Sequence, residues 1–273
     1  MDSEIRKIQL KCLEILDIVD GICKRHNIKY SLCGGSVVGA YLYNACLPWD
    51  DDVDLMMTRE NYNRFIKVAK HELPTGFSIH NYQTGHDFQV PFTKIMNDRT
   101  TIVQHDGNVS GVFLDITVYD RIPQNAFASI DIFLWKVSQV VMFGKVKPAN
   151  LRQRARNFML STVLRNKRAY LKLFQYVVEL CAKTSRHYHY SELFGAFANT
   201  TRFAPEVFEN YASVSFEGKD YMVVSDMYEY LHTRYNRTDF HEPKEKQTAP
   251  HYRYVDFNLP HNEYMAKQPV DGQ

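Results

Sequence analysis

The sequence lacks several features, and each absence narrows the class of protein. Its five cysteines are scattered and form no C-x-x-C pair, which favours reduced thiols in a cytoplasmic protein over a disulfide framework. The net charge is only +2, so no global field for holding nucleic acid exists and no nucleic-acid partner is expected. The charged start, MDSEIRK, is unlike a signal peptide. The most apolar window, residues 126–144, is interrupted by charged residues and does not predict a membrane-spanning helix.

The composition is otherwise that of a folded protein. The 273 residues are 45% hydrophobic and 23% charged, which allows one large domain or two modest ones. The aromatic content of 14% is high and fits a thick core, or a surface that faces sugars or a membrane. We expect a cytoplasmic protein that is dissolved or lies at the inner face of the membrane.

A glycine turn follows the first predicted strand. Residues 28–32 alternate like a strand and lead into Gly34 and Gly35, where the missing Cβ atoms let a ligand approach the backbone. Ser36 is the expected N-cap of a helix over residues 37–43. A strand, turn and helix in this order direct free N–H groups towards one point, which suits a phosphate.

Four carboxylates occur within five residues in the sequence DDDVD at residues 50–54. Carboxylates this close repel one another by about 1 kcal/mol per pair at 4 Å even in water, and a cation is the usual remedy. Strand alternation sends Asp52 and Asp54 to one face, and Val53 and Leu55 to the other face and the core. Two carboxylates on one face of a strand can share a metal.

A further predicted strand, residues 112–119, contains a single acid. Its apolar residues alternate along one face, and Asp115 projects from the opposite face together with Thr117. A lone acid inside such a strand is costly unless it is paired or bound to a metal. We therefore predict that Asp115 is the third carboxylate of the site.

The remaining pattern predicts both helices and strands. Nine Lys and Arg residues lie between positions 145 and 172 without an acid among them. This stretch indicates either an ordinary solvated helix face or a surface attracted to anionic lipid head groups or a polyanionic acceptor. Helices are expected over residues 3–26, after Thr58, over 126–181 and over 227–235. Asn27 can adopt the left-handed conformation and end the first helix. Short strands are expected over residues 77–81, 90–96 and 100–103, and a strand followed by a turn over 214–219.

The motifs together resemble the LicD family of the nucleotidyltransferase superfamily. The stretches CGGSVVGAYLYNACLPWDDDVDLMMTRENYNRF and GVFLDITVYDRIP carry the resemblance, and FEGKDYMVVSDMYEYLHTRYN adds to it more weakly. The family is named for phosphocholine transferases that decorate bacterial surface glycans, and fukutin-type ribitol-phosphate transferases are similar to it. The likeness extends over nearly the whole chain.

The resemblance implies an α+β fold with a nucleotidyltransferase-like mixed sheet flanked by helices and an additional, largely helical region. The catalytic core would span residues 1–125, and residues 126–273 would complete the substrate site and pack with the core as one unit. Carried over by position, the residues that are catalytic and hold Mg²⁺ or Mn²⁺ would be Asp52, Asp54 and Asp115.

The resemblance also implies the reaction and its partners. Phosphocholine, or a similar phospho-alcohol, would move from CDP-choline or a related donor to a hydroxyl of a cell-surface glycan or its lipid-linked precursor, releasing CMP. Where the family usually has an arginine followed by a histidine, this chain has Gln247 and His251. The substrate-binding residues would be Gly34, Gly35, Ser36, Asp51, Lys94 and His251, although a surface lysine explains Lys94 equally well.

Two alternatives use the same residues. A true nucleotidyltransferase would move a nucleoside monophosphate and release pyrophosphate. A non-catalytic module would bind a glycan or a membrane on the inherited scaffold.

Overall fold

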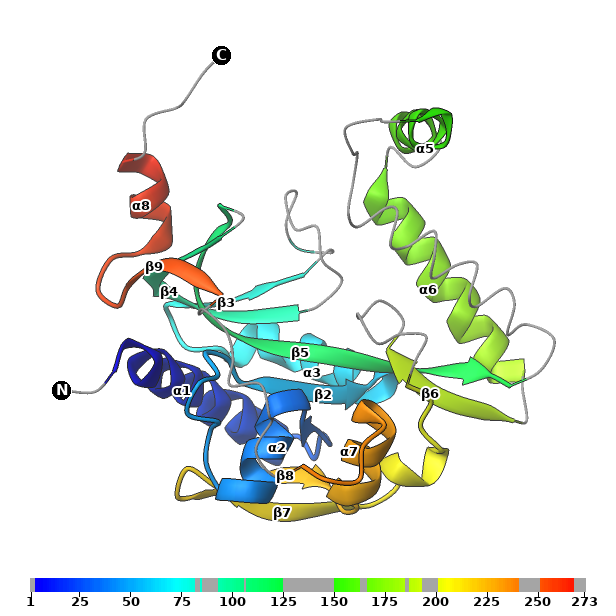
Figure 1. Ribbon diagram of the computed structural model, residues 1–273, viewed down its shortest axis with the longest axis horizontal. Helices are drawn as coiled ribbons and strands as arrows, with labels where there is room; N and C mark the ends of the chain where they lie inside the picture. Colours follow the sequence, from blue (N-terminus) through cyan, green and yellow to red (C-terminus); the bar gives the residue numbers. More distant parts are fainter. Residues whose placement is uncertain are drawn as a thin grey trace.

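The computed structural model describes residues 3–81, 84, 93–105, 107–124, 150–162, 166–184, 187–192, 201–240 and 251–267. Among these residues, seven strands form one mixed sheet in the order β1-β2-β5-β4-β3, with β6 beside β5 and β9 beside β4 (Figure 1). The strands are β1 (Ser31–Leu32), β2 (Asp54–Thr58), β3 (Phe77–His80), β4 (Thr93–Gln104), β5 (Val109–Pro123), β6 (Tyr188–Glu192) and β9 (Tyr252–Asp256).

Helices flank this sheet, as the α+β prediction requires. A separate hairpin consists of β7 (Tyr211–Phe216) and β8 (Lys219–Val224). The helices are α1 (Glu4–Arg25), α2 (Gly34–Tyr43), α3 (Arg59–Glu72), α5 (Leu151–Ser161), α6 (Lys167–Thr184), α7 (Met227–Tyr235), α8 (His261–Lys267) and the short 3₁₀ helix η1 (Pro205–Phe208). No helix in the described part of the chain is long and apolar enough to cross a membrane.

The core lies where α1 and α3 pack against each other and against the central strands. The apolar face of β5 includes Leu114 and Ile116, and both are fully buried, as is Leu55 on β2. Strand β2 runs parallel to β5, whereas β4 runs antiparallel to it. Strands β6 and β9 come from beyond residue 125 and extend the same sheet.

Several predicted boundaries are confirmed. The first helix ends before Asn27, which has the expected left-handed backbone with φ of 50°. Helix α7 has the predicted bounds. Helix α3 starts after Thr58, although the Thr58 hydroxyl accepts a hydrogen bond from Asn61 Nδ2 at 2.9 Å and does not cap a backbone N–H.

Among the other predicted strands, one boundary was wrong. From residue 93 onwards, the two strands expected over residues 90–96 and 100–103 form one strand, β4, and both parts pair with β5 on either side of a register shift between Asn97 and Ile102. Residues 90–92 lie outside the described residues. The strand and turn expected over residues 214–219 are confirmed, since β7 ends at Phe216 and a turn at Glu217 and Gly218 leads into β8. Residues 126–149 of the predicted helical region lie outside the described residues, as do Lys145, Lys147, Arg165 and Gln247.

Candidate active site

Three adjacent strands place Asp54, Asp115 and Lys94 in one row across the sheet, called here the site row. Asp54 on β2 is the register partner of Asp115 on β5, and Asp115 is the partner of Lys94 on β4. Register partners on neighbouring strands project from the same face. The sheet therefore brings together two of the three predicted metal ligands, which are sixty-one residues apart in the sequence.

Lys94 is an ion-pair partner within this row. Its Nζ donates to both carboxylate oxygens of Asp115, at 2.8 and 3.0 Å. The Lys94 ammonium also lies 3.2 Å from the centroid of the aromatic ring of Phe113, which precedes Asp115 by two residues on β5. Lys94 is therefore held by a carboxylate and an aromatic face, and it is not a solvated surface lysine.

The acidic loop, residues 50–53, brings more carboxylates beside the row. Burial and the neighbouring Asp54 carboxylate raise the pKa of Asp52 well above its usual value. Burial and Asp115 raise the pKa of Asp54 from 3.8 to about 7, even though Arg234 and Lys94 act in the opposite direction. The negative charge here exceeds what the nearby cations compensate, and an all-oxygen donor set of this kind fits a hard divalent ion.

Two distant side chains hold the acidic loop. Gln9 on α1 is buried, and its Nε2 donates to the carbonyl oxygens of Leu47 at 2.9 Å and Asp50 at 2.8 Å. Asp51 is also buried, and it accepts hydrogen bonds from the backbone N–H of His251 at 3.0 Å and from its Nδ1 at 2.7 Å. His251, predicted to bind substrate, therefore contacts the acidic loop directly.

A second set of ligand atoms is formed by Asp51, Asp52 and His251. One atom from each residue lies within 4.8 Å of the other two, so this group could also hold a metal ion. Among the described residues, Asp52, Asp54 and Asp115 do not form a group of ligand atoms this close to one another. Oxygen ligands therefore occur both in the acidic loop and in the site row.

The glycine turn lies directly against these acids. Gly34 has φ of +54°, and a Cβ there would lie 3.2 Å from Asp54 Oδ2. A Cβ on Gly35 would lie only 2.3 Å from Asp50 Oδ2, so a larger residue would force the Asp50 carboxylate to move. The close approach of backbone and carboxylates explains why both positions are glycine.

The start of α2 differs from the prediction. The helix begins at Gly34 with Cys33 as its N-cap, so Ser36 is inside the helix and its assignment as N-cap was wrong. The Ser36 hydroxyl instead accepts a hydrogen bond from the backbone N–H of Asp54 at 3.0 Å. Ser36 therefore joins the turn to the strand that carries Asp54.

Helix α7 contributes residues that the sequence reasoning missed. The Tyr230 hydroxyl accepts a hydrogen bond from the Gly34 N–H at 3.2 Å. Arg234 Nη1 donates to the Tyr119 hydroxyl at 2.8 Å and is paired with the buried Glu192 on β6. These contacts fix the glycine turn to β5 and β6. Spacing on α7 predicts a helix, but no sequence signal identifies which of its polar groups faces the site.

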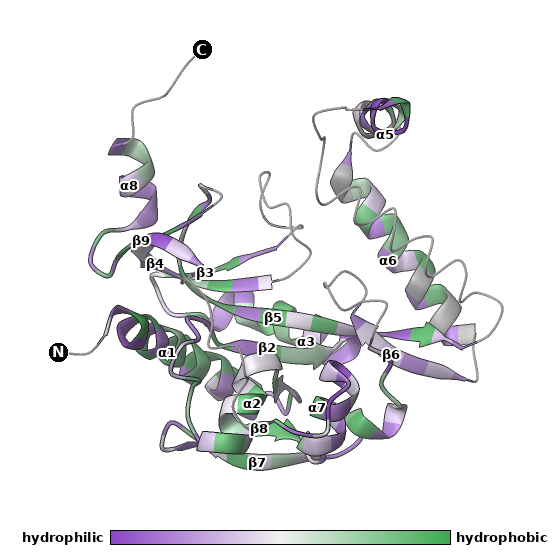
Figure 2. Cartoon of the chain, viewed as in Figure 1, coloured by the Kyte–Doolittle hydropathy of each residue, from purple (hydrophilic) through white to green (hydrophobic). Residues whose placement is uncertain are grey.

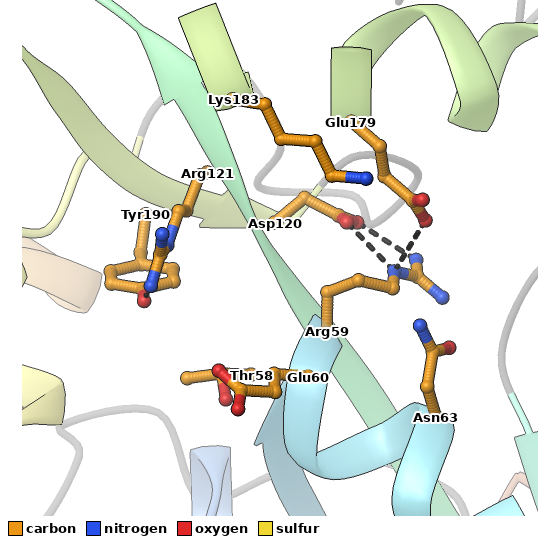
Figure 3. A pocket seen from close by; sticks show the side chains of 9 residues that line it. All are labelled: Thr58, Arg59, Glu60, Asn63, Asp120, Arg121, Glu179, Lys183 and Tyr190. Carbon is orange, nitrogen blue, oxygen red and sulfur yellow. Dashed lines mark hydrogen bonds and ion pairs between the residues drawn. The ribbon is translucent and has the colours of Figure 1, made fainter. Parts of the chain in front are cut away.

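A pocket of about 300 Å³ lies at the C-terminal ends of β2 and β5, away from the site row (Figure 3). Inside it, Arg59 donates to both Asp120 oxygens, at 2.8 and 2.9 Å, and its Nε lies 3.8 Å from Glu179. Asp120 is thus the ion-pair partner of Arg59, which anchors α3 to β5 and α6. The lining residues are Thr58, Arg59, Glu60, Asn63, Asp120, Arg121, Glu179, Lys183 and Tyr190.

The mixed sheet flanked by helices confirms the predicted α+β fold, and it places the site row beside the glycine turn at the start of α2. Residues 27–133 match the family model described as LicD/FKTN/FKRP, nucleotidyltransferase domain. This match supports the resemblance recognised from the sequence motifs for that part of the chain.

A relative extends the likeness beyond that domain. The chain is 29% identical over 262 residues to the lipopolysaccharide cholinephosphotransferase LicD of Haemophilus influenzae. The aligned region covers 91% of this chain and 96% of the relative. The likeness therefore extends well beyond residue 133 into the rest of the chain.

Proposed function

We propose that the protein transfers phosphocholine from CDP-choline to a hydroxyl of lipopolysaccharide or its lipid-linked precursor, with release of CMP. The observation that carries the proposal is the placement of Asp54 and Asp115 in one row, with Asp52 and the glycine turn beside them. The name of the Haemophilus relative supports the choice of phosphocholine and of lipopolysaccharide. A different phospho-alcohol on the same cytidine carrier would use the same groups.

We further propose that Asp52, Asp54 and Asp115 hold Mg²⁺ or Mn²⁺. When bound, such an ion would neutralise the donor phosphates and polarise the oxygen that leaves with CMP. The excess negative charge and the hard oxygen donors fit this cation. The group of Asp51, Asp52 and His251 would hold a second ion or a metal-bound water.

The chain's own residues have separate proposed roles. Asp115 accepts the proton of the acceptor hydroxyl, a step typically worth about 10²–10⁴-fold in rate. Lys94 orients Asp115 through its two hydrogen bonds and brings positive charge to the incoming phosphate. Gly34 and Gly35 let the donor phosphates approach the backbone where α2 begins.

We propose a cytoplasmic site of action at the inner face of the membrane. Free cysteines are buried within the described residues, as is usual in a reducing compartment. The lipid portion of the acceptor would remain in the membrane while the reaction takes place. Residues 126–273 would complete the substrate site, since His251, Tyr230 and Arg234 all come from that region.

The test is a donor screen read by CMP release. The purified protein is incubated with Mg²⁺ and lipopolysaccharide lacking phosphocholine, together with CDP-choline, CDP-ethanolamine, CDP-glycerol or CDP-ribitol. Asp54→Asn and Asp115→Asn should each lose at least about 10²-fold in turnover, whereas Asp17→Asn, an exposed acid paired with Lys219, should not. Unchanged turnover in both site variants would contradict the proposal.

The two alternatives predict different products. A true nucleotidyltransferase would release pyrophosphate from a triphosphate donor and leave CDP-choline intact. A non-catalytic module would turn over neither donor and would show no binding of divalent metal or cytidine nucleotides in calorimetry. The uncompensated acids beside the glycine turn favour the enzyme over the module.

A further inference from the structure

Helix α6 carries apolar residues on two opposite faces. Leu171 and Phe174 are buried, and this face packs against β5. On the opposite face, Leu173, Tyr176 and Leu180 follow one another at helical spacing and are 61%, 63% and 50% exposed. A surface helix normally has only one apolar face, so the second, exposed apolar face of α6 has the character of a binding surface.

Helix α5 also exposes apolar residues on one face. Leu151 and Phe158 are seven residues apart, lie on one helical face, and are 81% and 69% exposed. Arg154 lies on the same face and is also exposed. The two helices extend from the sheet, with α5 at the outer end of α6 (Figure 1), and Figure 2 shows hydrophobic residues distributed among hydrophilic ones along both. Both helices therefore expose large apolar side chains, and these exposed faces are called here the outer surface of α5 and α6.

The charges around this outer surface are positive. Arg152 and Arg154 on α5 and Lys172 on α6 are exposed, and the sequence of α5 contains no acid. The acid of α6, Glu179, faces away towards the pocket, where it lies 3.8 Å from Arg59. Large apolar side chains with cations beside them have the chemistry of a helix that lies in an anionic lipid interface.

We propose that the outer surface of α5 and α6 binds the head-group region of an anionic lipid bilayer. Leu173, Tyr176 and Leu180 enter the boundary between head groups and acyl chains, and the cations contact lipid phosphates. A second copy of the chain is a poorer occupant, because a symmetric contact would bring these cations against one another. The inference deepens the proposed function, since it holds the enzyme where a lipid-linked acceptor resides.

The experiment is co-sedimentation of the full chain with large vesicles, without donor or acceptor. Vesicles of phosphatidylcholine alone are compared with vesicles that also contain phosphatidylglycerol, at low and high salt. Wild-type protein should bind the anionic vesicles at least about tenfold more strongly, and salt should weaken that binding. Replacing Leu173, Tyr176 and Leu180 together by serine should reduce binding by at least about tenfold.

A matched control replaces apolar residues of similar exposure on other helices. Leu10, Tyr228 and Met265 are 44%, 44% and 47% exposed, and their triple serine variant should bind vesicles like the wild type. Circular dichroism and thermal unfolding verify that both variants are folded. A double variant, Arg154→Gln with Lys172→Gln, should lose mainly the preference for anionic vesicles.

Three results would overturn the inference. They are absence of wild-type binding to anionic vesicles, equal binding by the α6 triple variant, and self-association that the triple variant abolishes while vesicle binding persists. CMP release with a delipidated, soluble acceptor does not depend on this surface. A protein that turns over the soluble acceptor but ignores vesicles therefore refutes the membrane surface alone, and one that binds vesicles without turnover refutes the proposed function alone.

Discussion

Replacing Asp54 by asparagine should stabilise the metal-free protein at neutral pH while it removes turnover. Burial and the charge of Asp115 raise the pKa of Asp54 from 3.8 to about 7. Because the pKa of Asp54 is higher in the folded protein than in the unfolded chain, the stability that Asp54 contributes is fully present below about pH 4. It is lost as the pH rises through about 7. Asparagine has nearly the same shape but no charge, so it avoids this loss.

The size of the effect follows from the two pKa values. One pKa unit corresponds to about 1.4 kcal/mol, so the change from 3.8 to about 7 sets an upper limit of about 4 kcal/mol. Asp52 and Asp115 share the same repulsion, so the neighbouring carboxylates redistribute part of this free energy when Asp54 is neutralised. The variant also gives up the attraction of Asp54 to Lys94 and Arg234. We expect a net gain of about 1–3 kcal/mol in the free energy of unfolding at about pH 8.

Urea unfolding in the presence of a chelator measures this difference at about pH 5 and about pH 8. The gain of Asp54→Asn over the wild type should be less than half as large at the lower pH, because most of the stability is lost between about pH 5 and about pH 7. Added Mg²⁺ should stabilise the wild type more than the variant, because the ion binds the folded acids. A variant that is less stable than the wild type at about pH 8, or a gain that is equal at both pH values, would refute the reasoning.

Three further predictions concern the glycine turn, the ion pair of Lys94 with Asp115 and the ion pair of Arg59 with Asp120. Gly35→Ala should destabilise the fold and remove turnover, because its Cβ would lie 2.3 Å from a carboxylate oxygen of the acidic loop. The control Gly21→Ala, whose Cβ meets nothing closer than 3.4 Å within α1, should gain about 0.5–1 kcal/mol in urea unfolding. Lys94→Met should lower the rate of CMP release by about tenfold to a hundredfold with the fold retained, and an unchanged rate would show that the ion pair does not orient the base. Arg59→Leu should cost about 3–5 kcal/mol in thermal unfolding, since it leaves Asp120 buried without its partner, and leucine at both positions should cost less than Arg59→Leu alone.

The elements that carry the site were predictable because their patterns are local. Alternation identified β5 and the isolated acid Asp115 within it, and the glycines identified the glycine turn at the start of α2. Asn27 ended the first helix as expected, since its short polar side chain tolerates a left-handed backbone. In each case, neighbours along the chain are enough to decide the structure.

The contacts between elements were not predictable in the same way. The pairing of Lys94 with Asp115 depends on the register of β4 and β5, and the shift between Asn97 and Ile102 leaves no trace in the hydrophobic pattern. Gln9 appears as an ordinary polar residue of an amphipathic helix, yet it is buried and holds the acidic loop. Such roles arise from packing between distant segments.

The start of α2 shows a different limit. Serine is a preferred N-cap, so Ser36 was the natural choice by propensity. The structure uses its hydroxyl to accept the Asp54 N–H, and the helix starts two residues earlier at Gly34. A tertiary hydrogen bond to the neighbouring strand outweighed the local preference.

The clamp between His251 and Asp51 has a consequence for the order of events during protein synthesis. The glycine turn and all three proposed metal ligands have been synthesised once residue 115 is added, whereas His251 and β9 follow more than 130 residues later. Domains generally begin to fold from the N-terminal side as they are made. A nascent chain therefore presents the crowded acids before His251 exists to bind Asp51, and the acidic loop gains this contact only after residue 251 has been added.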